Sequence, residues 1–314
     1  MLQKSRTSGF RMGHKFIRIV KPKKDNYLLY AGAGIFSCTS LLYLLLDFYN
    51  PTLFKNPDRF GDLDSVVLIF LGAVIIAPVT EELTFRGYFL KNKIFTYFFF
   101  GGSTIFILLT GTYYALSILL ILGILEFVFK VHRRTKIIYF LNTLLFAIMH
   151  YKLSHFTNIY SVIPVFFQFS IGLILLWITI NYSLIRSMLV HFCVNFLAMG
   201  SLILALQFPD TRLHTVQDDK IFITFSKTPV LGNENFYFTD SEVQANNSTI
   251  RNFVQLLNVK EKNFVVNDSL RYYRYNFKIK SLNNEKLESS AVQKILIDAK
   301  LIEPSKDVSE KNNF

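Results

Sequence analysis

Long apolar runs separated by short polar segments dominate the chain up to Leu206. Uncharged runs span Tyr27–Leu46, Ser65–Thr80, Ile94–Leu125, Ile137–Met149 and Phe156–Ile185, and another apolar segment extends from Ser187 to about Phe208. A helix crosses the bilayer core with about 20 apolar residues. Gly111, near the centre of the longest run, favours a tight hairpin. The pattern predicts an all-α multi-pass transmembrane helical bundle of six to seven helices.

The character of the chain changes at Gln207. Pro209-Asp210 opens a polar stretch, and the residues from Tyr273 to Lys280 alternate with period two, which is typical of a half-buried strand. Ile221–Phe225 also has strand character, and helical periodicity recurs near Asn247–Leu257 and Ser290–Leu301. We therefore expect a basic N-terminal tail (1–26), a transmembrane domain (27–206) and a small C-terminal α+β appendage of unknown role (207–314).

Composition and charge support a membrane protein. The chain is 51% hydrophobic and contains 33 Phe, too apolar for an ordinary soluble domain. Of its net charge of +12, nearly all lies in the apolar part, with 19 Lys/Arg against 8 Asp/Glu through Leu206 and 15 against 14 afterwards. Basic residues at the ends of apolar segments indicate topology and contact with membrane lipid, so we expect no nucleic-acid partner.

The first apolar run is expected to remain in the mature protein. Tyr27–Leu46 is longer than a signal-peptide core, and Asp47-Phe48-Tyr49 is no small-residue cleavage site. The positive-inside rule places the N-terminal tail and the cluster Lys130–Lys136 on the cytoplasmic side, and therefore the C-terminal region outside. We expect an integral, multi-pass protein of a bacterial inner membrane.

Two adjacent carboxylates, Glu81 and Glu82, interrupt an apolar segment. A charged side chain at bilayer depth costs several kcal/mol on insertion scales, so the pair indicates a function. Pro78 is expected to kink or restart the helix, with Thr80 as a possible cap. Arg86, four residues after Glu82, can pair with it on one helix face. Glu81 is rotated by about 100° and is the freer carboxylate, unless both simply lie solvated at the interface.

Two further polar positions show the same four-residue spacing. Phe146 and His150 share one helix face, and so do His191 and Asn195. Taken alone, His150 could be a capping or interfacial residue, and the His191–Asn195 pair could cross-link helices. Together with the glutamates, these positions predict one polar site among the helices.

The three motifs resemble a known family. The pattern of Glu81-Glu82-x-x-x-Arg86, Phe146-x-x-x-His150 and His191-x-x-x-Asn195 is similar to that of the CPBP intramembrane proteases. That family includes CAAX prenyl endopeptidases and membrane proteins related to abortive infection and bacteriocin immunity. The resemblance covers about Ser65 to Met199. The apolar insertion between the first two motifs and the region after Gln207 depart from the short family core.

The resemblance implies a role for each motif residue. Glu81 would activate the hydrolytic water with help from His150, and His191 and Asn195 would stabilise the oxyanion. Glu82 and Arg86 would support the site. These residue types suit peptide hydrolysis, which needs a sequestered water, a base and donors aimed at the developing oxyanion.

Other readings of the same residues stay open. Glu81, His150 and His191 could instead hold zinc with an open position, although no His-Glu-x-x-His signature occurs. The family has been described both as metalloproteases and as glutamate proteases. We expect an intramembrane endopeptidase acting on a peptide or membrane-protein substrate. The alternatives are a non-proteolytic scaffold or bacteriocin-immunity-type protein, and a proton-coupled transporter that titrates Glu81.

Overall fold

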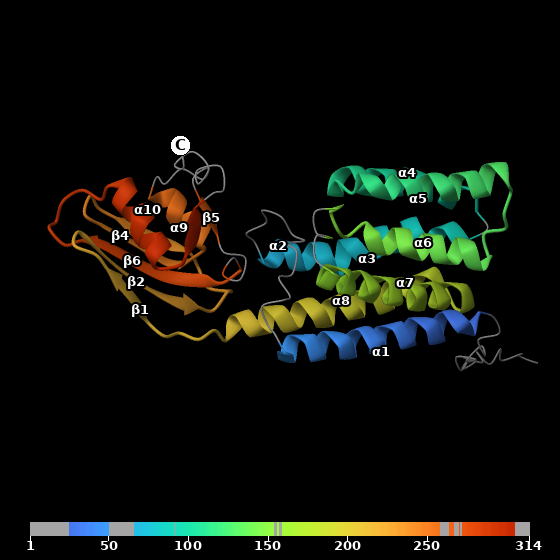
Figure 1. Ribbon diagram of the computed structural model, residues 1–314, viewed down its shortest axis with the longest axis horizontal. Helices are drawn as coiled ribbons and strands as arrows, with labels where there is room; N and C mark the ends of the chain where they lie inside the picture. Colours follow the sequence, from blue (N-terminus) through green and yellow to red (C-terminus); the bar gives the residue numbers. More distant parts are fainter. Residues whose placement is uncertain are drawn as a thin grey trace, which may run out of the picture.

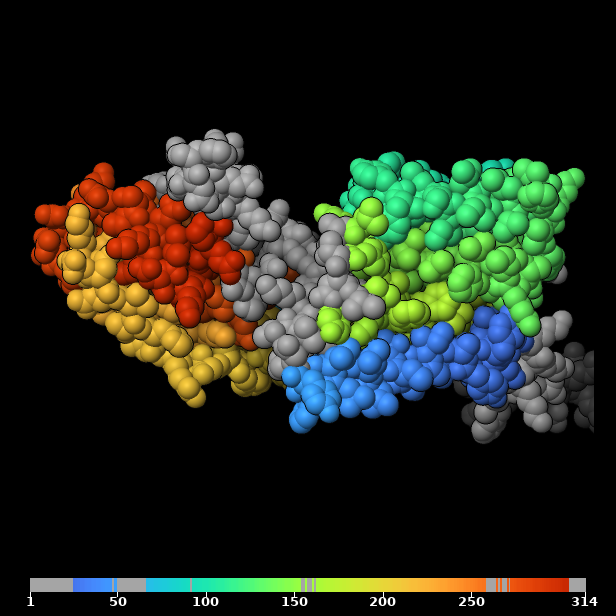
Figure 2. Space-filling view, in the orientation of Figure 1, coloured from blue at the N-terminus to red at the C-terminus, as the bar shows by residue number. Residues whose placement is uncertain are grey.

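A computed structural model describes residues 25–49, 66–90, 92–153, 156, 159–257, 264–266, 270 and 272–304. A bundle of apolar helices lies at one end of an elongated molecule, and a small domain of strands and helices lies at the other (Figures 1 and 2). Nearly all of the predicted basic tail falls outside the described residues.

The bundle is built from eight labelled α-helices within the described residues. They are α1 (Asn26–Tyr49), α2 (Val66–Leu71), α3 (Ala77–Glu81), α4 (Ile94–Thr110), α5 (Leu116–Gly123), α6 (Lys136–Ile148), α7 (Ile163–Asn181) and α8 (Leu184–Gln207). In the part of the chain that the structure describes, four helical stretches are long and apolar enough to cross a membrane: Asn26–Leu46, Val66–Phe89, Ile163–Asn181 and Leu184–Gln207. Three apolar helices are shorter, at Ile94–Thr110, Tyr113–Val128 and Lys136–Ile148. A mostly helical part with four candidate membrane spans is thus confirmed.

The connections follow local backbone chemistry. Gly111 adopts φ = 69°, a left-handed conformation that glycine tolerates, and it ends α4 at the hairpin predicted within the longest apolar run. The predicted run Phe156–Ile185 contains α7, which ends at Asn181. Ser183 then caps α8 by accepting a hydrogen bond from the Arg186 backbone N–H at 3.2 Å.

Small residues set the closest approach between helices. A Cβ on Gly32 of α1 would lie 2.8 Å from Ile174 and 2.9 Å from the carbonyl oxygen of Ser170, both on α7. Because lipid supplies little hydrophobic force between helices, such close backbone contact is what holds them together. Figure 1 shows α3 and α6 in the middle of the bundle, between α4 and α5 on one side and α1, α7 and α8 on the other.

The C-terminal domain is an antiparallel sheet with helices on one face. Five strands, β1 (His214–Gln217), β2 (Ile221–Thr228), β3 (Asn235–Phe238), β4 (Glu242–Ser248) and β6 (Arg274–Ser281), pair in the order β1-β2-β6-β4-β3. A separate pair joins β5 (Phe264–Val266) to β7 (Ile302–Pro304). The helices are α9 (Ile250–Leu256) and α10 (Ser289–Asp298).

The alternation predicted for Tyr273–Lys280 explains how the sheet faces its core. Tyr275, Phe277 and Ile279 of β6 are buried, whereas the residues between them are exposed. The buried side pairs with Ile223 and Phe225 of β2 and packs beneath α9 and α10. A C-terminal sheet was expected from the sequence, and the structure confirms it.

The sheet domain rests on two helices that lead to the polar site. Val230, from the loop after β2, packs with Val66 at the start of α2 and Leu206 near the end of α8. The Leu231 backbone N–H also donates to the Gln207 side-chain oxygen at 3.2 Å. The domain therefore contacts α2 and α8 at the ends opposite their connections to α4 and α7.

We predict that Phe277→Ala destabilises the sheet domain by about 3–5 kcal/mol. Phe277 is 2% exposed, and its ring stacks on Phe253 with centroids 4.2 Å apart. Phe238→Ala is the matched control, because Phe238 is 68% exposed on the edge strand β3. Thermal melting with limited proteolysis after residue 207 measures the effect. Equal losses in the two variants would contradict this account of the core.

Candidate active site

The two glutamates lie on a single continuous helical stretch, Val66–Phe89. Two wider π-helical turns, Gly72–Ile76 and Glu82–Arg86, flank α3. The expected helix restart capped by Thr80 is therefore wrong: Thr80 donates its hydroxyl back to the carbonyl oxygen of Ile76, at 2.8 Å, within a helix that continues. The widened turn before Pro78 accommodates the proline that would otherwise break the helix.

Asn195 compensates for the hydrogen bond that Pro78 cannot make. In the first π turn, the Ala77 N–H donates to the carbonyl of Gly72, five residues back. The next carbonyl, that of Ala73, would take its partner from residue 78, but proline has no N–H. The Asn195 side-chain amide of α8 donates to this carbonyl instead, at 2.7 Å. One of the two hydrogens of that amide is therefore already used within the protein.

Glu82 is the buried centre of the cluster. Its side chain is 0% exposed, and its Oε2 accepts a hydrogen bond from the Ser187 hydroxyl at 2.6 Å. Arg86 Nε lies 3.6 Å from the same oxygen, so the predicted ion pair is present. His191 Nδ1 lies 3.1 Å from Oε1. A buried carboxylate needs such partners because its desolvation is otherwise costly.

Glu81 faces two imidazole rings. His150 Nε2 lies 3.6 Å from Glu81 Oε1, and His191 Nε2 lies 3.9 Å from Oε2. The Glu81 side chain is 14% exposed, unlike that of its neighbour. His150 Nδ1 is 2.8 Å from the Phe146 carbonyl, which can only accept, so this nitrogen carries a proton. In the neutral ring, the lone pair on Nε2 therefore points toward Glu81.

Arg86 is held by more than its carboxylate. Its guanidinium lies 4.0 Å from the centroid of the Phe146 ring, and its Nη2 donates to the Gly172 carbonyl of α7 at 3.3 Å. The Phe146 ring also packs edge-on against the His150 imidazole, with centroids 5.2 Å apart. One aromatic ring thus separates and orients two polar groups of the site.

The structure brings five of the six predicted site residues into one cluster, namely Glu81, Glu82, Arg86, His150 and His191. Asn195 lies one turn beyond His191 on α8 and contacts the Ala73 carbonyl instead. Sequence reasoning missed two participants, the Ser187 hydroxyl and the Gly172 carbonyl. Ser187 precedes His191 by four residues, so the spacing that paired His191 with Asn195 could also have found it. A backbone carbonyl such as that of Gly172 leaves no sequence signal.

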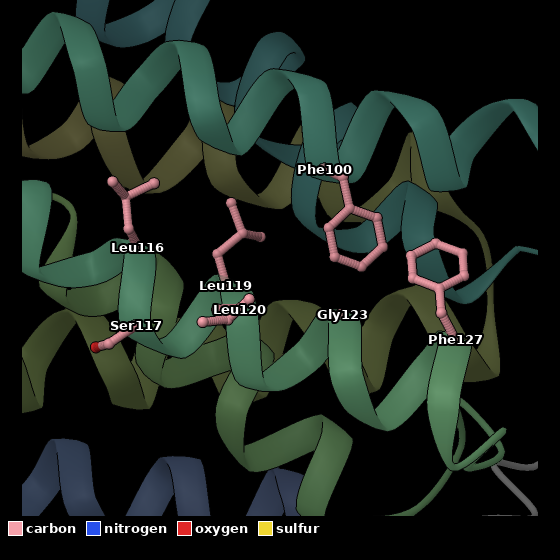
Figure 3. A pocket seen from close by; sticks show the side chains of 7 residues that line it. All are labelled: Phe100, Leu116, Ser117, Leu119, Leu120, Gly123 and Phe127. Carbon is pink, nitrogen blue, oxygen red and sulfur yellow. The ribbon is translucent and has the colours of Figure 1, made fainter.

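A separate recess on the outside of the bundle takes no part in this cluster. It lies between α4 and α5, has a volume of about 480 Å³, and is lined by Phe100, Leu116, Ser117, Leu119, Leu120, Gly123 and Phe127. Figure 3 shows these side chains, which are almost all apolar and include none of the predicted site residues. This lining fits lipid contact rather than hydrolytic chemistry.

A comparison with protein families matches the segment that carries the motifs. A family profile described as type II CAAX prenyl endopeptidase Rce1-like matches residues 63–197. The matched residues make up less than half of the chain. This Rce1-like segment, residues 63–197, contains all six predicted site residues, and the resemblance to CAAX proteases is thereby confirmed. No curated protein and no solved structure matches the chain.

The similarity of this segment to Rce1-like proteins indicates a class of activity. The family implies an endopeptidase, and therefore a peptide or protein substrate. Together with the four long apolar helices, it indicates an integral membrane protein. The sheet domain lies beyond the matched residues, so the family says nothing about its role.

The geometry of the Rce1-like segment bears on the zinc alternative. Within the described residues, no group of three or more His, Cys, Asp or Glu side chains is placed to hold a metal ion. His150 and His191 hold their Nδ1 atoms against the Phe146 carbonyl and Glu82, and they turn their Nε2 atoms toward Glu81 at 3.6 and 3.9 Å. Metal-ligating histidines hold their second ring nitrogen in the same way, so these contacts leave the zinc alternative open.

We predict that Gly172→Ala destabilises the bundle by about 1–3 kcal/mol, because the core has no room for a methyl group there. Its Cβ would lie 2.8 Å from Thr143, 3.1 Å from Phe146 and 3.3 Å from Arg86 Nη2. Gly200→Ala in α8 is the control, since nothing lies within 4 Å of its Cβ position. Thermal melting in detergent compares them, and a Gly172→Ala melt equal to that of the control would contradict the packing.

Proposed function

We propose that this chain is an intramembrane endopeptidase that hydrolyses a peptide bond in or near the bilayer. The observation that supports it best is the placement of Glu81 Oε1 and Oε2 at 3.6 and 3.9 Å from the Nε2 atoms of His150 and His191. A partly exposed carboxylate between two imidazoles, in an Rce1-like segment, suits proton transfer to and from a water molecule.

The first step is activation of water. Glu81 Oε1 and His150 Nε2 are too far apart for a direct hydrogen bond, but one water molecule can reach both. Glu81 takes a proton from this water as its oxygen attacks the scissile carbonyl carbon. His150 holds the water in place by accepting its other hydrogen, because Nδ1 already carries the ring proton.

The second step is stabilisation and collapse of the tetrahedral intermediate. In this proposal, His191 and the remaining amide hydrogen of Asn195 act as donors to the developing oxyanion. Glu82 stabilises a positive charge on the His191 ring through Nδ1, 3.1 Å away. When the carbon–nitrogen bond breaks, the proton held by Glu81 passes to the leaving amine, so the base returns to its carboxylate form.

The substrate class follows from the family name. Rce1-like proteins are described as CAAX prenyl endopeptidases, so a prenylated peptide with a C-terminal CAAX sequence is the first substrate to test. A scaffold, an immunity protein and a proton-coupled transporter would keep the same cluster without peptide turnover. An assay of peptide cleavage therefore separates the proposal from all three.

We predict that Glu81→Gln lowers turnover by about a hundredfold or more while the protein stays folded, because glutamine cannot accept the proton of water. Purified protein in detergent is incubated with a peptide library that includes farnesylated and unprenylated CAAX peptides. Mass spectrometry then identifies the cleaved bonds. Cleavage by wild type that is equal in Glu81→Gln, or no cleavage by wild type, would overturn the proposal.

Two controls complete this experiment. Glu242→Gln changes an exposed-side carboxylate of the sheet domain, paired with Lys278 at 3.1 Å, and should leave turnover unchanged. A chelator titration tests metal dependence independently of the variants. Loss of turnover that Zn²⁺ restores would assign Glu81 and the histidines to a metal instead of to direct proton transfer.

The same proposal includes a multi-pass topology with the sheet domain outside the cell. The start of α1, the start of α6 and the end of α7 meet at one end of the bundle. There the Tyr139 hydroxyl donates to Asp25 at 3.1 Å, and the Trp177 ring N–H donates to the Asn26 side chain at 3.2 Å. On this side, Lys93, Lys130, Arg133 and Arg134 lie in the connections, and Lys136 and Arg186 lie in the first turns of α6 and α8. By the positive-inside rule, this end is cytoplasmic.

We predict that an impermeant maleimide labels Asn284→Cys but not Arg134→Cys in intact bacteria. Both positions are exposed, one in the turn after β6 and the other before α6. The background carries Cys38→Ala and Cys193→Ala, which removes both native cysteines. Labelling of both sites after permeabilisation is the control. The reverse pattern in intact cells would place the sheet domain in the cytoplasm.

A further inference from the structure

The hydroxyl of Ser187 joins three helical elements of the bundle at one point. It lies on α8, and its oxygen is 2.6 Å from Glu82 Oε2 and 2.9 Å from the Leu175 carbonyl of α7. Ser187 is fully buried. Both neighbours are acceptors, so the single hydroxyl proton of Ser187 is shared between the Glu82 carboxylate, which is the nearer acceptor, and the Leu175 carbonyl. No resemblance or family assignment gives this serine a role.

Helix α7 supports the cluster through its backbone. It carries none of the six predicted site residues, yet two of its carbonyls, three residues apart and so on one face, point into the cluster. Gly172 accepts from Arg86 Nη2 at 3.3 Å, and Leu175 lies against the Ser187 hydroxyl. The carbonyls of Gly172 and Leu175 therefore hold Arg86 and Ser187, which are the two partners of Glu82 Oε2.

The position of Oε2 determines that of the other carboxylate oxygen. With Oε2 held by Ser187, Glu82 Oε1 lies 3.1 Å from His191 Nδ1. The opposite ring nitrogen, Nε2, then faces Glu81 at 3.9 Å. A one-turn spacing on α8 places both Ser187 and His191 on the same carboxylate. Rotation of the Glu82 carboxylate would remove the partner that sets the orientation and tautomer of His191.

We propose that Ser187 is a positioning residue, which locks the Glu82 carboxylate so that His191 presents Nε2 to the reacting centre. The hydrogen bond from Ser187 to Glu82 would affect turnover by orienting His191, without any contact between Ser187 and the substrate. The kinetic consequence rests on the proposed endopeptidase function. The structural consequence, a fixed His191 ring with its Nδ1 proton on Glu82, does not.

Ser187→Ala tests the proposal against Ser201→Ala. Ser201 lies on the same helix, and its hydroxyl donates only to the Leu197 carbonyl one turn earlier, at 2.6 Å. With a farnesylated CAAX peptide as probe, Ser187→Ala should lower kcat roughly tenfold to a hundredfold and leave KM within about twofold, the result of losing one hydrogen bond to a charged group. Ser187→Cys replaces the hydroxyl with a thiol, which is a weaker donor, so its kcat should fall between that of the wild type and that of Ser187→Ala.

A second readout needs no substrate. In protein labelled with ¹⁵N-histidine, the His191 resonance is assigned among the six histidines by its absence in His191→Gln. Ser187→Ala should shift the Nδ1 signal, and Ser201→Ala should not. An unshifted His191 signal, or a kcat equal to that of Ser201→Ala, would overturn the positioning role. If the wild type cleaves no peptide, the proposed function fails and the His191 signal alone decides the role of Ser187.

Discussion

The buried carboxylate of Glu82 is the interaction around which the membrane part is organised. A charge at this depth is tolerated only when partners replace its hydration. Arg86, Ser187 and His191 supply them at 3.6, 2.6 and 3.1 Å. These partners come from the same helical stretch and from α8, and α7 holds two of them through backbone carbonyls. The contacts of this one carboxylate therefore fix the relative placement of three helical elements. Removing one partner would leave the carboxylate and its remaining partners incompletely hydrogen-bonded.

The backbone beside the glutamates follows the same logic. A proline inside a membrane helix leaves a carbonyl without its usual partner, which lipid cannot replace. Here the carbonyl is that of Ala73, and Asn195 of α8 fills the role. Asn195 thus ties α8 to the turn preceding Glu81, four residues along the same helix from the contact between His191 and Glu82. The residue assigned to the oxyanion is also a structural link, so its replacement would affect geometry as well as chemistry.

Much of this arrangement was accessible from sequence because its signals are local. The lengths of the apolar runs predicted the helical part, and Gly111 predicted the hairpin. The four-residue spacing predicted that Glu82 and Arg86 share a helix face, and likewise His191 and Asn195. Period-two alternation gave β6. Three features could not be predicted from the sequence. The two π turns and the Gly172 carbonyl belong to the backbone, and the contact of Arg86 with the Phe146 ring joins residues far apart in the chain. The Thr80 cap failed because the π turn let the helix pass through Pro78 unbroken.

Adjacent glutamates acquire different chemistry from their angular separation alone. Successive residues of a helix point about 100° apart, so one carboxylate can face the helix contacts while the next faces an accessible space. Glu82 is 0% exposed and surrounded by donors, whereas Glu81 is 14% exposed and flanked by two imidazole nitrogens. Both oxygens of the Glu82 carboxylate already have partners within the protein. The Glu81 carboxylate is more exposed and has no contact shorter than 3.6 Å to the imidazoles, and this difference is why we propose Glu81 as the base and Glu82 as its structural support.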